Sequence, residues 1–257
     1  MQTSRIANRT ARLIRHGISG LSHSRTMQIK LVVLDIAGTT VRDDDSANRC
    51  LREALASNGI AVTPQQISAV MGLPKPIAIG SLLEQHEPQA KGSLTQRVTA
   101  MHDEFLERMV SFYQTAAEVE PMPYTIEALG EIKAAGVRLA LDTGFSRPIS
   151  DAILGRLGWD HGGLFDVTVA SDEVPRGRPF PDLIFKAMSL TRVTDLQAVA
   201  KVGDTPADLR EGTAAGCALV IGVTNGAHTR EQLALHSHTH LISSLKELPG
   251  LVLRTRS

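Results

Sequence analysis

Short apolar runs recur along the chain and alternate with amphipathic stretches, and this alternation restricts the fold more than any other feature. The apolar runs lie at residues 29–34, 137–141, 167–170, 198–200 and 218–223. Helical patterns lie between or after them at residues 125–135, 146–157, 181–190 and 206–215. Continuous apolar runs are typical of parallel strands that are buried on both faces. Strand followed by helix, repeated, predicts an α/β fold with a doubly wound, Rossmann-like parallel sheet.

One long interval breaks this alternation. Residues 42–120 are mostly helical in pattern and contain no comparable β-branched run, so we interpret them as an inserted helical cap. The α/β core then comprises residues 27–41 and 121–257. Residues 1–26 contain five arginines and no acidic residue. We expect a disordered basic tail there, although an organellar presequence or a start codon upstream of a true start at Met27 would explain the same bias.

Composition narrows the class of protein. The 257 residues, 42% of them hydrophobic, are enough for one core and a smaller appended domain. Lys and Arg total 27, as do Asp and Glu, so no charge excess indicates nucleic acid or an anionic membrane as a partner. No apolar run reaches the roughly 18 residues that a membrane-spanning helix needs. Cys50 and Cys217 are too few and too far apart for a disulfide framework or a zinc site. We expect a cytoplasmic enzyme with a small-molecule partner, and we leave a homodimer open.

Polar residues follow the predicted strands at equivalent positions. They are Asp35, Asp142-Thr143-Gly144, Ser171-Asp172 and Gly203-Asp204. In an open parallel sheet, ligands bind beyond the carboxyl ends of the strands, where these residues would gather. This clustering of carboxylates, hydroxyls and glycines therefore predicts a functional site. By contrast, we expect the stretch with His236, His238 and His240 to be a surface loop rather than a metal-binding strand.

The residue types at these strand ends suit an anion and a cation. Thr143 and Gly144 offer a hydroxyl and backbone N–H groups to an oxyanion. Asp208 follows Asp204 by one helical turn, which brings both carboxylates to one rim, and oxygen ligands suit Mg²⁺. Taken alone, Asp35 is explained equally well as a strand-end residue that caps a turn.

Together the motifs are more specific than any one of them. The segments Asp35-Ile-Ala-Gly-Thr-Thr, Thr143-Gly144, a later basic residue and Gly203-Asp-Thr-Pro-Ala-Asp resemble, in this order, the motifs of haloacid dehalogenase-like hydrolases. The resemblance extends from about Met27 to the end of the chain. It implies that Asp35 is a nucleophile that attacks phosphorus, and that water later hydrolyses the phospho-enzyme.

The same resemblance assigns the other site residues. It implies that Asp35, the Ala37 carbonyl and Asp204 hold Mg²⁺, with Asp208 in support. It also implies that Thr143 and Gly144 cradle the phosphoryl group.

Ala37 departs from the superfamily pattern. Phosphatases of this superfamily carry a second Asp at this position, which protonates the leaving group. Its loss leaves three explanations open: an inactive protein, a phosphatase with a displaced acid, or a reaction whose leaving group needs no such proton.

Two further segments favour the third explanation. Met71-Gly-Leu-Pro-Lys75 resembles the Met-Gly-x-x-Lys segment of phosphonoacetaldehyde hydrolases, whose lysine condenses with the substrate aldehyde. An iminium at Lys75 would accept electrons, so carbon could leave phosphorus as an enamine. Gly177-Arg-Pro-Phe-Pro resembles a segment of the same family, which implies that Arg178 grips the phosphoryl group. Lys201 is a second candidate cation. Alone, Lys75 would be read as a solvated lysine.

Other positions differ from this family. Ala78 stands where the phosphonoacetaldehyde hydrolases have a histidine, Phe145 where they have a tyrosine, and Asp45 near where they have a cysteine. The sequence therefore predicts cleavage of phosphonoacetaldehyde or a related phosphono-aldehyde. A phosphatase that acts on a small phosphate ester and a non-catalytic phosphometabolite-binding protein remain the alternatives.

Overall fold

The computed structural model describes residues 28–254 except residues 44, 71–74, 88–92 and 162. The predicted basic tail therefore lies outside the described residues. Among the helices of the described part, none is both long and apolar enough to cross a membrane.

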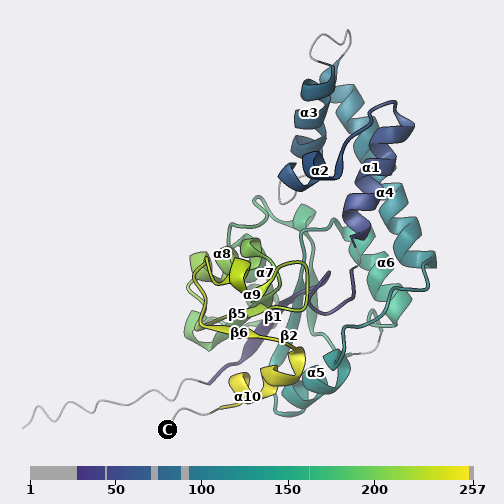
Figure 1. Cartoon of the computed structure of the whole chain (residues 1–257). Coiled ribbons are helices and arrows are strands. Elements are labelled where there is room, and N and C mark those ends of the chain that lie inside the picture. Colours follow the sequence, from purple (N-terminus) through teal and green to yellow (C-terminus); the bar gives the residue numbers. More distant parts are fainter. Residues whose placement is uncertain (1–27, 44, 71–74, 88–92, 162, 255–257) are drawn as a thin grey trace, which may run out of the picture.

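The described residues form a single sheet of six parallel strands, in the order β3-β2-β1-β4-β5-β6 (Figure 1). The strands are β1 (Leu31–Asp35), β2 (Arg138–Asp142), β3 (Val167–Val169), β4 (Val199–Gly203), β5 (Leu219–Val223) and β6 (His240–Ile242). The predicted α/β class and doubly wound sheet are confirmed, and the first five strands overlap the predicted apolar runs. We did not predict β6, and the expectation of a loop was wrong for His240. A strand of three residues that begins with histidine has no apolar run to reveal it.

Helices cover the sheet and fill the interval between β1 and β2. Between these two strands come α1 (Ser46–Ser57), α2 (Pro64–Val70), α3 (Lys75–His86), α4 (Leu94–Thr115) and α5 (Thr125–Ala134). The later helices are α6 (Arg147–Leu157), α7 (Asp182–Thr191), α8 (Pro206–Ala215), α9 (Arg230–Leu233) and α10 (Leu248–Val252). Single 3₁₀ turns lie at Ser171–Glu173, Leu196–Ala198 and Leu245–Glu247.

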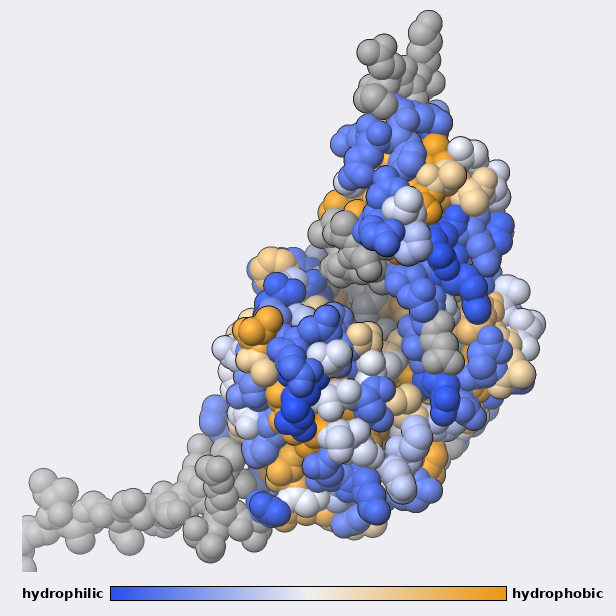
Figure 2. Space-filling view, viewed as in Figure 1, coloured by the Kyte–Doolittle hydropathy of each residue, from blue (hydrophilic) through white to orange (hydrophobic). Residues whose placement is uncertain are grey.

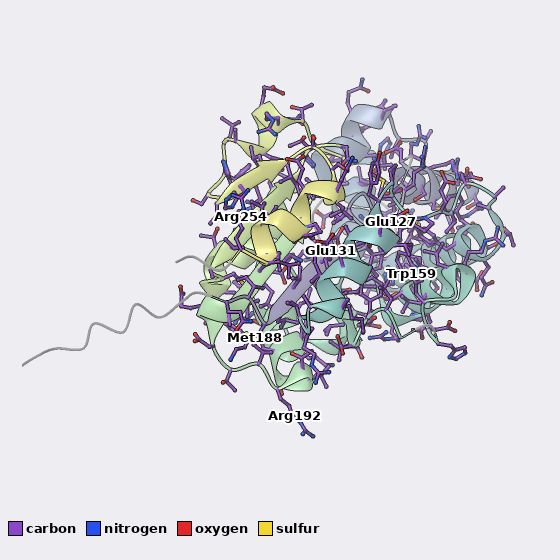
Figure 3. All side chains as sticks on the ribbon, turned by 90° about the horizontal axis from the view of Figure 1, so that it is seen from below. Glu127, Glu131, Trp159, Met188, Arg192 and Arg254 are labelled. Carbon is purple, nitrogen blue, oxygen red and sulfur yellow. The ribbon has the colours of Figure 1, made fainter. Side chains whose placement is uncertain are left out.

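Both faces of the central strand β1 are buried, which explains its continuous apolar sequence. Side chains alternate across a strand, so Val32 and Leu34 join one core cluster while Leu31 and Val33 join another. The first cluster includes residues of α5 and α6, and the second includes residues of α7. Seen from below, α10 lies beside α5, the helix that carries Glu127 and Glu131 (Figure 3). The sheet is therefore covered on both sides, as a parallel sheet requires.

Helices α1 to α4 stand beyond one end of the sheet (Figure 1). Helix α4 buries a stripe of residues at four-residue spacing, namely Met101, Phe105, Met109 and Tyr113. This stripe belongs to the same core cluster as one face of the sheet. The chain enters and leaves this group of helices through adjacent segments, because Val41 pairs with Pro121 in an antiparallel bridge. The surface is hollowed between these helices and the sheet (Figure 2).

Replacing a side chain in the middle of β1 should strongly destabilise the protein. Leu34 is completely buried, so Leu34→Ala should lower the free energy of unfolding by about 2–5 kcal/mol through lost burial and a residual cavity. Leu235 is 83% exposed, and Leu235→Ala should change stability by less than about 0.5 kcal/mol. Urea denaturation followed by circular dichroism measures both. Equal losses for the two variants would contradict the assignment of β1 to the core.

Candidate active site

The candidate site lies where the strand order reverses. Within the sheet, β2 and β3 lie to one side of β1. The chain then returns to the other side of β1 and adds β4. Asp35 is the last residue of β1, and Asp142 is its register partner at the end of β2. Gly203 ends β4, and Asp204 follows it. The predicted strand-end residues therefore meet at one edge of the sheet, at the position where such folds bind ligands.

The tight turn after β1 packs against Asp204. Gly38 has a φ of +82°, and a Cβ atom there would lie 2.3 Å from Oδ2 of Asp204, so both backbone and packing require glycine. Thr39 donates a hydrogen bond of 2.8 Å from its hydroxyl to Oδ1 of Asp204. The backbone N–H of Ala227 donates a 2.7 Å bond to Oδ2. These contacts fix the orientation of the Asp204 carboxylate, next to the turn that contains Ala37.

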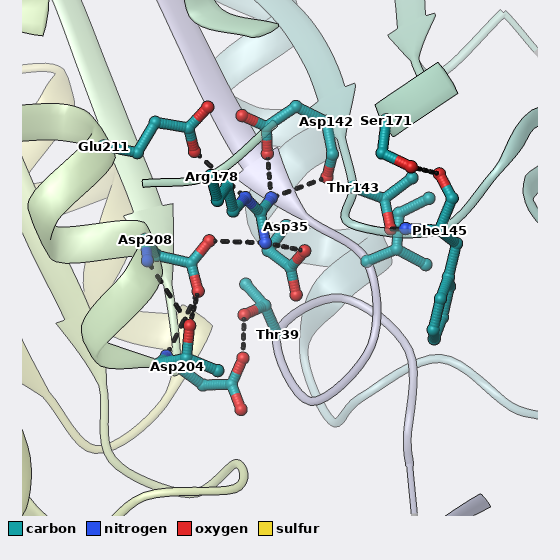
Figure 4. Close-up of polar contacts among 12 residues, drawn as sticks. Asp35, Thr39, Asp142, Thr143, Phe145, Ser171, Arg178, Asp204, Asp208 and Glu211 are labelled. Atoms are coloured by element: carbon teal, nitrogen blue, oxygen red, sulfur yellow. Dashed lines mark hydrogen bonds and ion pairs between the residues drawn. The ribbon is translucent and has the colours of Figure 1, made fainter. Parts of the chain in front are cut away.

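Arg178 reaches into the centre of this site (Figure 4). Its Nη1 lies 2.6 Å from Oδ1 of Asp35 and 2.8 Å from Oδ1 of Asp208. Its Nε donates a 3.0 Å hydrogen bond to Oε2 of Glu211. Its Nη2 donates a 3.0 Å bond to the Asp142 carbonyl and also contacts the Asp142 carboxylate. The guanidinium is therefore held on all three of its nitrogens, with one of them against the predicted nucleophile.

A second cation of the site, Lys201, is completely buried on β4. Its Nζ contacts the Asp142 carboxylate and lies 3.3 Å from Oδ1 of Asp208 and 3.1 Å from Oε2 of Glu211. Burial and the charge of Arg178 oppose its protonation, but these three carboxylates raise its pKa above the ordinary value. Lys201 is therefore a buried cation that contacts the carboxylates around Arg178.

Thr143 and Gly144 follow Asp142 at the same edge. The Thr143 side chain is almost fully buried, and its hydroxyl accepts a 3.1 Å hydrogen bond from the backbone N–H of Phe145. Gly144 is exposed, and a Cβ atom placed on it would meet no described atom within 4 Å. The loop after β2 therefore borders open space in which an anion could lie.

Burial and the neighbouring charges shift the pKa values of the carboxylates. Burial raises the pKa of Asp35 well above its ordinary value, although Arg178 opposes this. The pKa of Asp204 rises to about 6, mainly through burial and then through the charge of Asp208. Burial acts in the same sense on Asp208, but the charges of Arg178 and Lys201 outweigh it and lower its pKa. The site therefore holds more negative charge than its own cations neutralise.

The donor atoms suit a hard cation. Oxygens of Asp35, Asp142 and Asp208 lie within 4.8 Å of one another, close enough for a metal ion. Arg178 already bridges these three carboxylates, so the guanidinium accounts for their proximity. The second Asp35 oxygen is directed instead toward the side of Thr39 and Asp204 (Figure 4). Carboxylate oxygens in excess of nearby cations are suitable ligands for a divalent metal.

Lys75 lies apart from the strand ends, on the inserted helices. It is the first residue of α3, and its Nζ is 6.0 Å from the centroid of the Phe105 ring on α4. Burial lowers its pKa to about 8. The positive end of the helix dipole acts in the same direction. Met71, the other residue predicted from this segment, lies outside the described residues.

Sequence reasoning missed two residues of the site. The sequence marks Asp142 only as a strand-end residue, and no motif indicates Glu211. A glutamate on an amphipathic helix is normally exposed, yet Glu211 is completely buried. Its one available signal was its position one helical turn after Asp208, on the face of α8 that meets β4.

The fold and this arrangement of strand-end residues define a family. Residues 32–222 match the model of the haloacid dehalogenase-like hydrolases, and the chain belongs to that family. It is therefore a hydrolase. Among its relatives is the phosphonoacetaldehyde hydrolase of Syntrophobacter fumaroxidans, 31% identical over 199 residues that cover 74% of this chain and 71% of the relative. That of Bacteroides fragilis is 27% identical over 254 residues, which cover 88% of this chain and 96% of the relative.

Solved structures confirm the fold. A phosphonoacetaldehyde hydrolase-like protein from Oleispira antarctica has a TM-score of 0.75 at 22% identity, covering 88% of this chain and 91% of the other. CbbY from Rhodobacter sphaeroides, solved in complex with phosphate, has a TM-score of 0.70 at 23% identity, covering 86% and 96%.

The raised pKa of Asp204 predicts how metal-free stability depends on pH. Because the folded state holds this proton more tightly than the unfolded state, the contribution of Asp204 to stability falls as pH rises from about 4 to about 6. A shift from 3.8 to about 6 corresponds to a cost on the order of 3 kcal/mol at neutral pH. Asp204→Asn should therefore melt at a higher temperature than wild type at pH 7.5, with a smaller difference at pH 4, in chelator-treated protein.

Asp166 provides the matched control. Its pKa is lowered, because hydrogen bonds from the Leu139 N–H and Arg138 outweigh the effect of burial. Its carboxylate stabilises the fold above about pH 4, so Asp166→Asn should lower the melting temperature at pH 7.5. If both variants shift the melting temperature in the same direction at pH 7.5, the assignment of excess negative charge to Asp204 is wrong.

Proposed function

We propose that this hydrolase cleaves the carbon–phosphorus bond of phosphonoacetaldehyde or a related phosphono-aldehyde, with Asp35 as nucleophile and Lys75 as a Schiff-base lysine. The observation that carries this proposal is the placement of Lys75, half-buried at the start of α3 and over the ring of Phe105. The names of the relatives at 27–31% identity support the same substrate class.

Condensation with an aldehyde requires a neutral amine. With a pKa of about 8, roughly a tenth of Lys75 is neutral at pH 7, far more than for a solvated lysine. Attack of the Lys75 nitrogen on the aldehyde carbon and loss of water give an iminium. This group is an electron acceptor placed two bonds from phosphorus, so it can take up the electron pair of the bond that breaks.

The phosphoryl transfer then needs no acid beside Asp35. A carboxylate oxygen of Asp35 attacks phosphorus, the carbon–phosphorus bond breaks, and its electron pair forms the enamine of Lys75. Protonation of the enamine carbon and hydrolysis of the resulting iminium release the aldehyde product and free Lys75. Water hydrolyses the aspartyl phosphate to inorganic phosphate and restores Asp35. Ala37, which cannot protonate a leaving group, is compatible with this route and unfavourable for ester hydrolysis.

The residues at the strand ends would position the phosphoryl group. The Nη1 donor that Arg178 now gives to Asp35 would pass to a phosphoryl oxygen when Asp35 attacks phosphorus. The Gly144 backbone borders open space at the end of β2, and the neighbouring Thr143 hydroxyl would help it to cradle the phosphoryl group. Asp35, the Ala37 carbonyl and Asp204 would hold Mg²⁺, with Asp208 in support, as their excess negative charge favours. Bound Mg²⁺ would supply the charge that draws nucleophile and phosphoryl oxygens together.

Residues 42–120 would act as the cap. The paired segments at Val41 and Pro121 form the connection between this insertion and the sheet, and a change of backbone angles there would move α1 to α4. Closure would bring Lys75 to the aldehyde carbon of a substrate whose phosphorus is held at Asp35, and would exclude water from the reaction.

Substitution of Lys75 separates carbon–phosphorus cleavage from ester hydrolysis. Lys75→Arg should reduce phosphate release from phosphonoacetaldehyde at least about a hundredfold, because a guanidinium stays protonated and forms no iminium. Any hydrolysis of simple phosphate esters should largely survive, since that reaction does not use the amine. Asp35→Asn should abolish both reactions, and Lys246→Arg, an exposed lysine, should change neither. Phosphate release measures all three.

Trapping gives an independent readout. Borohydride added during turnover should reduce the iminium to a stable adduct on Lys75, detected by peptide mass spectrometry, and Lys75→Arg should give none. If Lys75→Arg releases phosphate from the best phosphono-aldehyde at the wild-type rate and no adduct forms, the Schiff-base mechanism fails. Activity restricted to phosphate esters would then indicate a phosphatase with a displaced acid. A wild type that binds phosphate but turns over none of these substrates would indicate a non-catalytic binding protein.

Mg²⁺ should stabilise the folded protein through Asp204. A ligand at one hundred times its dissociation constant adds about 2.7 kcal/mol to stability, so Mg²⁺ should raise the wild-type melting temperature. Asp204→Asn should lose most of this rise, because the amide removes one charged oxygen ligand. Asp166→Asn, which alters a carboxylate at the other end of β2, should respond to Mg²⁺ like wild type. Equal rises in Asp204→Asn and wild type would exclude Asp204 as a ligand.

A further inference from the structure

Three buried carboxylates each contact both Lys201 and Arg178. One Asp142 oxygen contacts both Lys201 Nζ and Arg178 Nη2. One Asp208 oxygen lies 3.3 Å from Lys201 Nζ and 2.8 Å from Arg178 Nη1. One Glu211 oxygen lies 3.1 Å from Lys201 Nζ and 3.0 Å from Arg178 Nε. Each carboxylate thus joins the ammonium to a different nitrogen of the guanidinium.

The backbone is adapted to this contact. A Cβ atom on Gly212 would lie 2.9 Å from Cβ of Lys201, so glycine lets α8 approach β4 closely. That approach brings Glu211, the preceding residue, to Lys201 and Arg178. Both Lys201 and Glu211 are completely buried. None of their described contacts reaches the open space beside Gly144. They are therefore placed to act through Arg178 rather than on a substrate.

We infer that Lys201 and Glu211 are positioning residues that hold the Arg178 guanidinium in one plane, with Nη1 directed at Asp35, ready for the phosphoryl group. This inference rests on the proposed function and deepens it. An arginine side chain has many rotamers, and fixing it before the substrate binds removes an ordering cost from the reaction. Lys201 holds the three carboxylates together, and Glu211 supplies the contact to Nε that sets the rotation of the guanidinium.

The arrangement also gives a reason for arginine at this position. A lysine at residue 178 has a single nitrogen and cannot contact three carboxylates along three directions while also facing Asp35. The three bridging carboxylates would then keep only Lys201 as a common partner. Lys201 and Glu211 should therefore affect kcat and phosphate binding only when residue 178 is arginine. This dependence distinguishes positioning from a general contribution to stability.

A double-mutant cycle tests this dependence. Glu211→Met removes the acceptor for Nε with little change in size, and it should fold because it also reduces the excess of buried negative charge. It should lower kcat and weaken binding of orthophosphate, measured calorimetrically with Mg²⁺, by about tenfold each. In the Arg178→Lys background the same change should have less than about a twofold effect. Glu211→Gln, which keeps an acceptor oxygen, should lose less than Glu211→Met.

Controls separate the possible failures. Glu131 is exposed on α5, away from the strand ends, and Glu131→Gln should leave kcat and phosphate binding unchanged (Figure 3). Thermal unfolding verifies that each variant is folded. If Glu211→Met does not fold, the cycle is run with Glu211→Gln. Equal losses in both backgrounds would overturn the positioning role, as would a wild type that binds no orthophosphate. A wild type that binds phosphate but hydrolyses no substrate would refute the proposed function alone, because the binding cycle still tests the positioning role.

Discussion

Excess negative charge buried at the ends of the central strands is the constraint on which the rest of the site depends. Asp35, Asp204 and their neighbours are removed from water, and two cations, the nearly buried Arg178 and the completely buried Lys201, offset only part of their charge. The folded state tolerates this because each cation is shared among several carboxylates. It also prepares the site for further positive charge, which a divalent ion at Asp35 and Asp204 would provide.

The two chemical groups needed for carbon–phosphorus cleavage come from different parts of the fold. The carboxylates and Arg178 belong to the strand ends of the sheet, where their charges reinforce one another. Lys75 belongs to the inserted helices, where burial lowers its pKa to about 8. Separating the amine from the acidic cluster matters, because nearby carboxylates would favour its protonated form and prevent condensation with an aldehyde.

Much of the fold could be predicted because local pattern and tertiary environment agree. The strands β1 and β4 are buried on both faces, so their apolar sequence identifies them directly. Asp35 and Asp204 could be predicted as site residues because they end such strands. The strand β6 could not be predicted, because a short strand at the sheet edge has little apolar sequence. Glu211 could not either, because nothing local separates a buried glutamate from a solvated one.

By itself, the sequence determined the order of the first five strands, the nucleophile candidate at Asp35 and the absence of an acid at Ala37. These are properties of residue type and spacing, which hold before any long-range contact forms. Only the tertiary structure decided which charges meet. Arg178, Lys201 and Glu211 are brought together from a loop, a strand and a helix, and the pairing depends on the close approach of α8 to β4 at Gly212. Burial is a property of the assembled layers, so the environment of each ionisable group became evident only once they had packed.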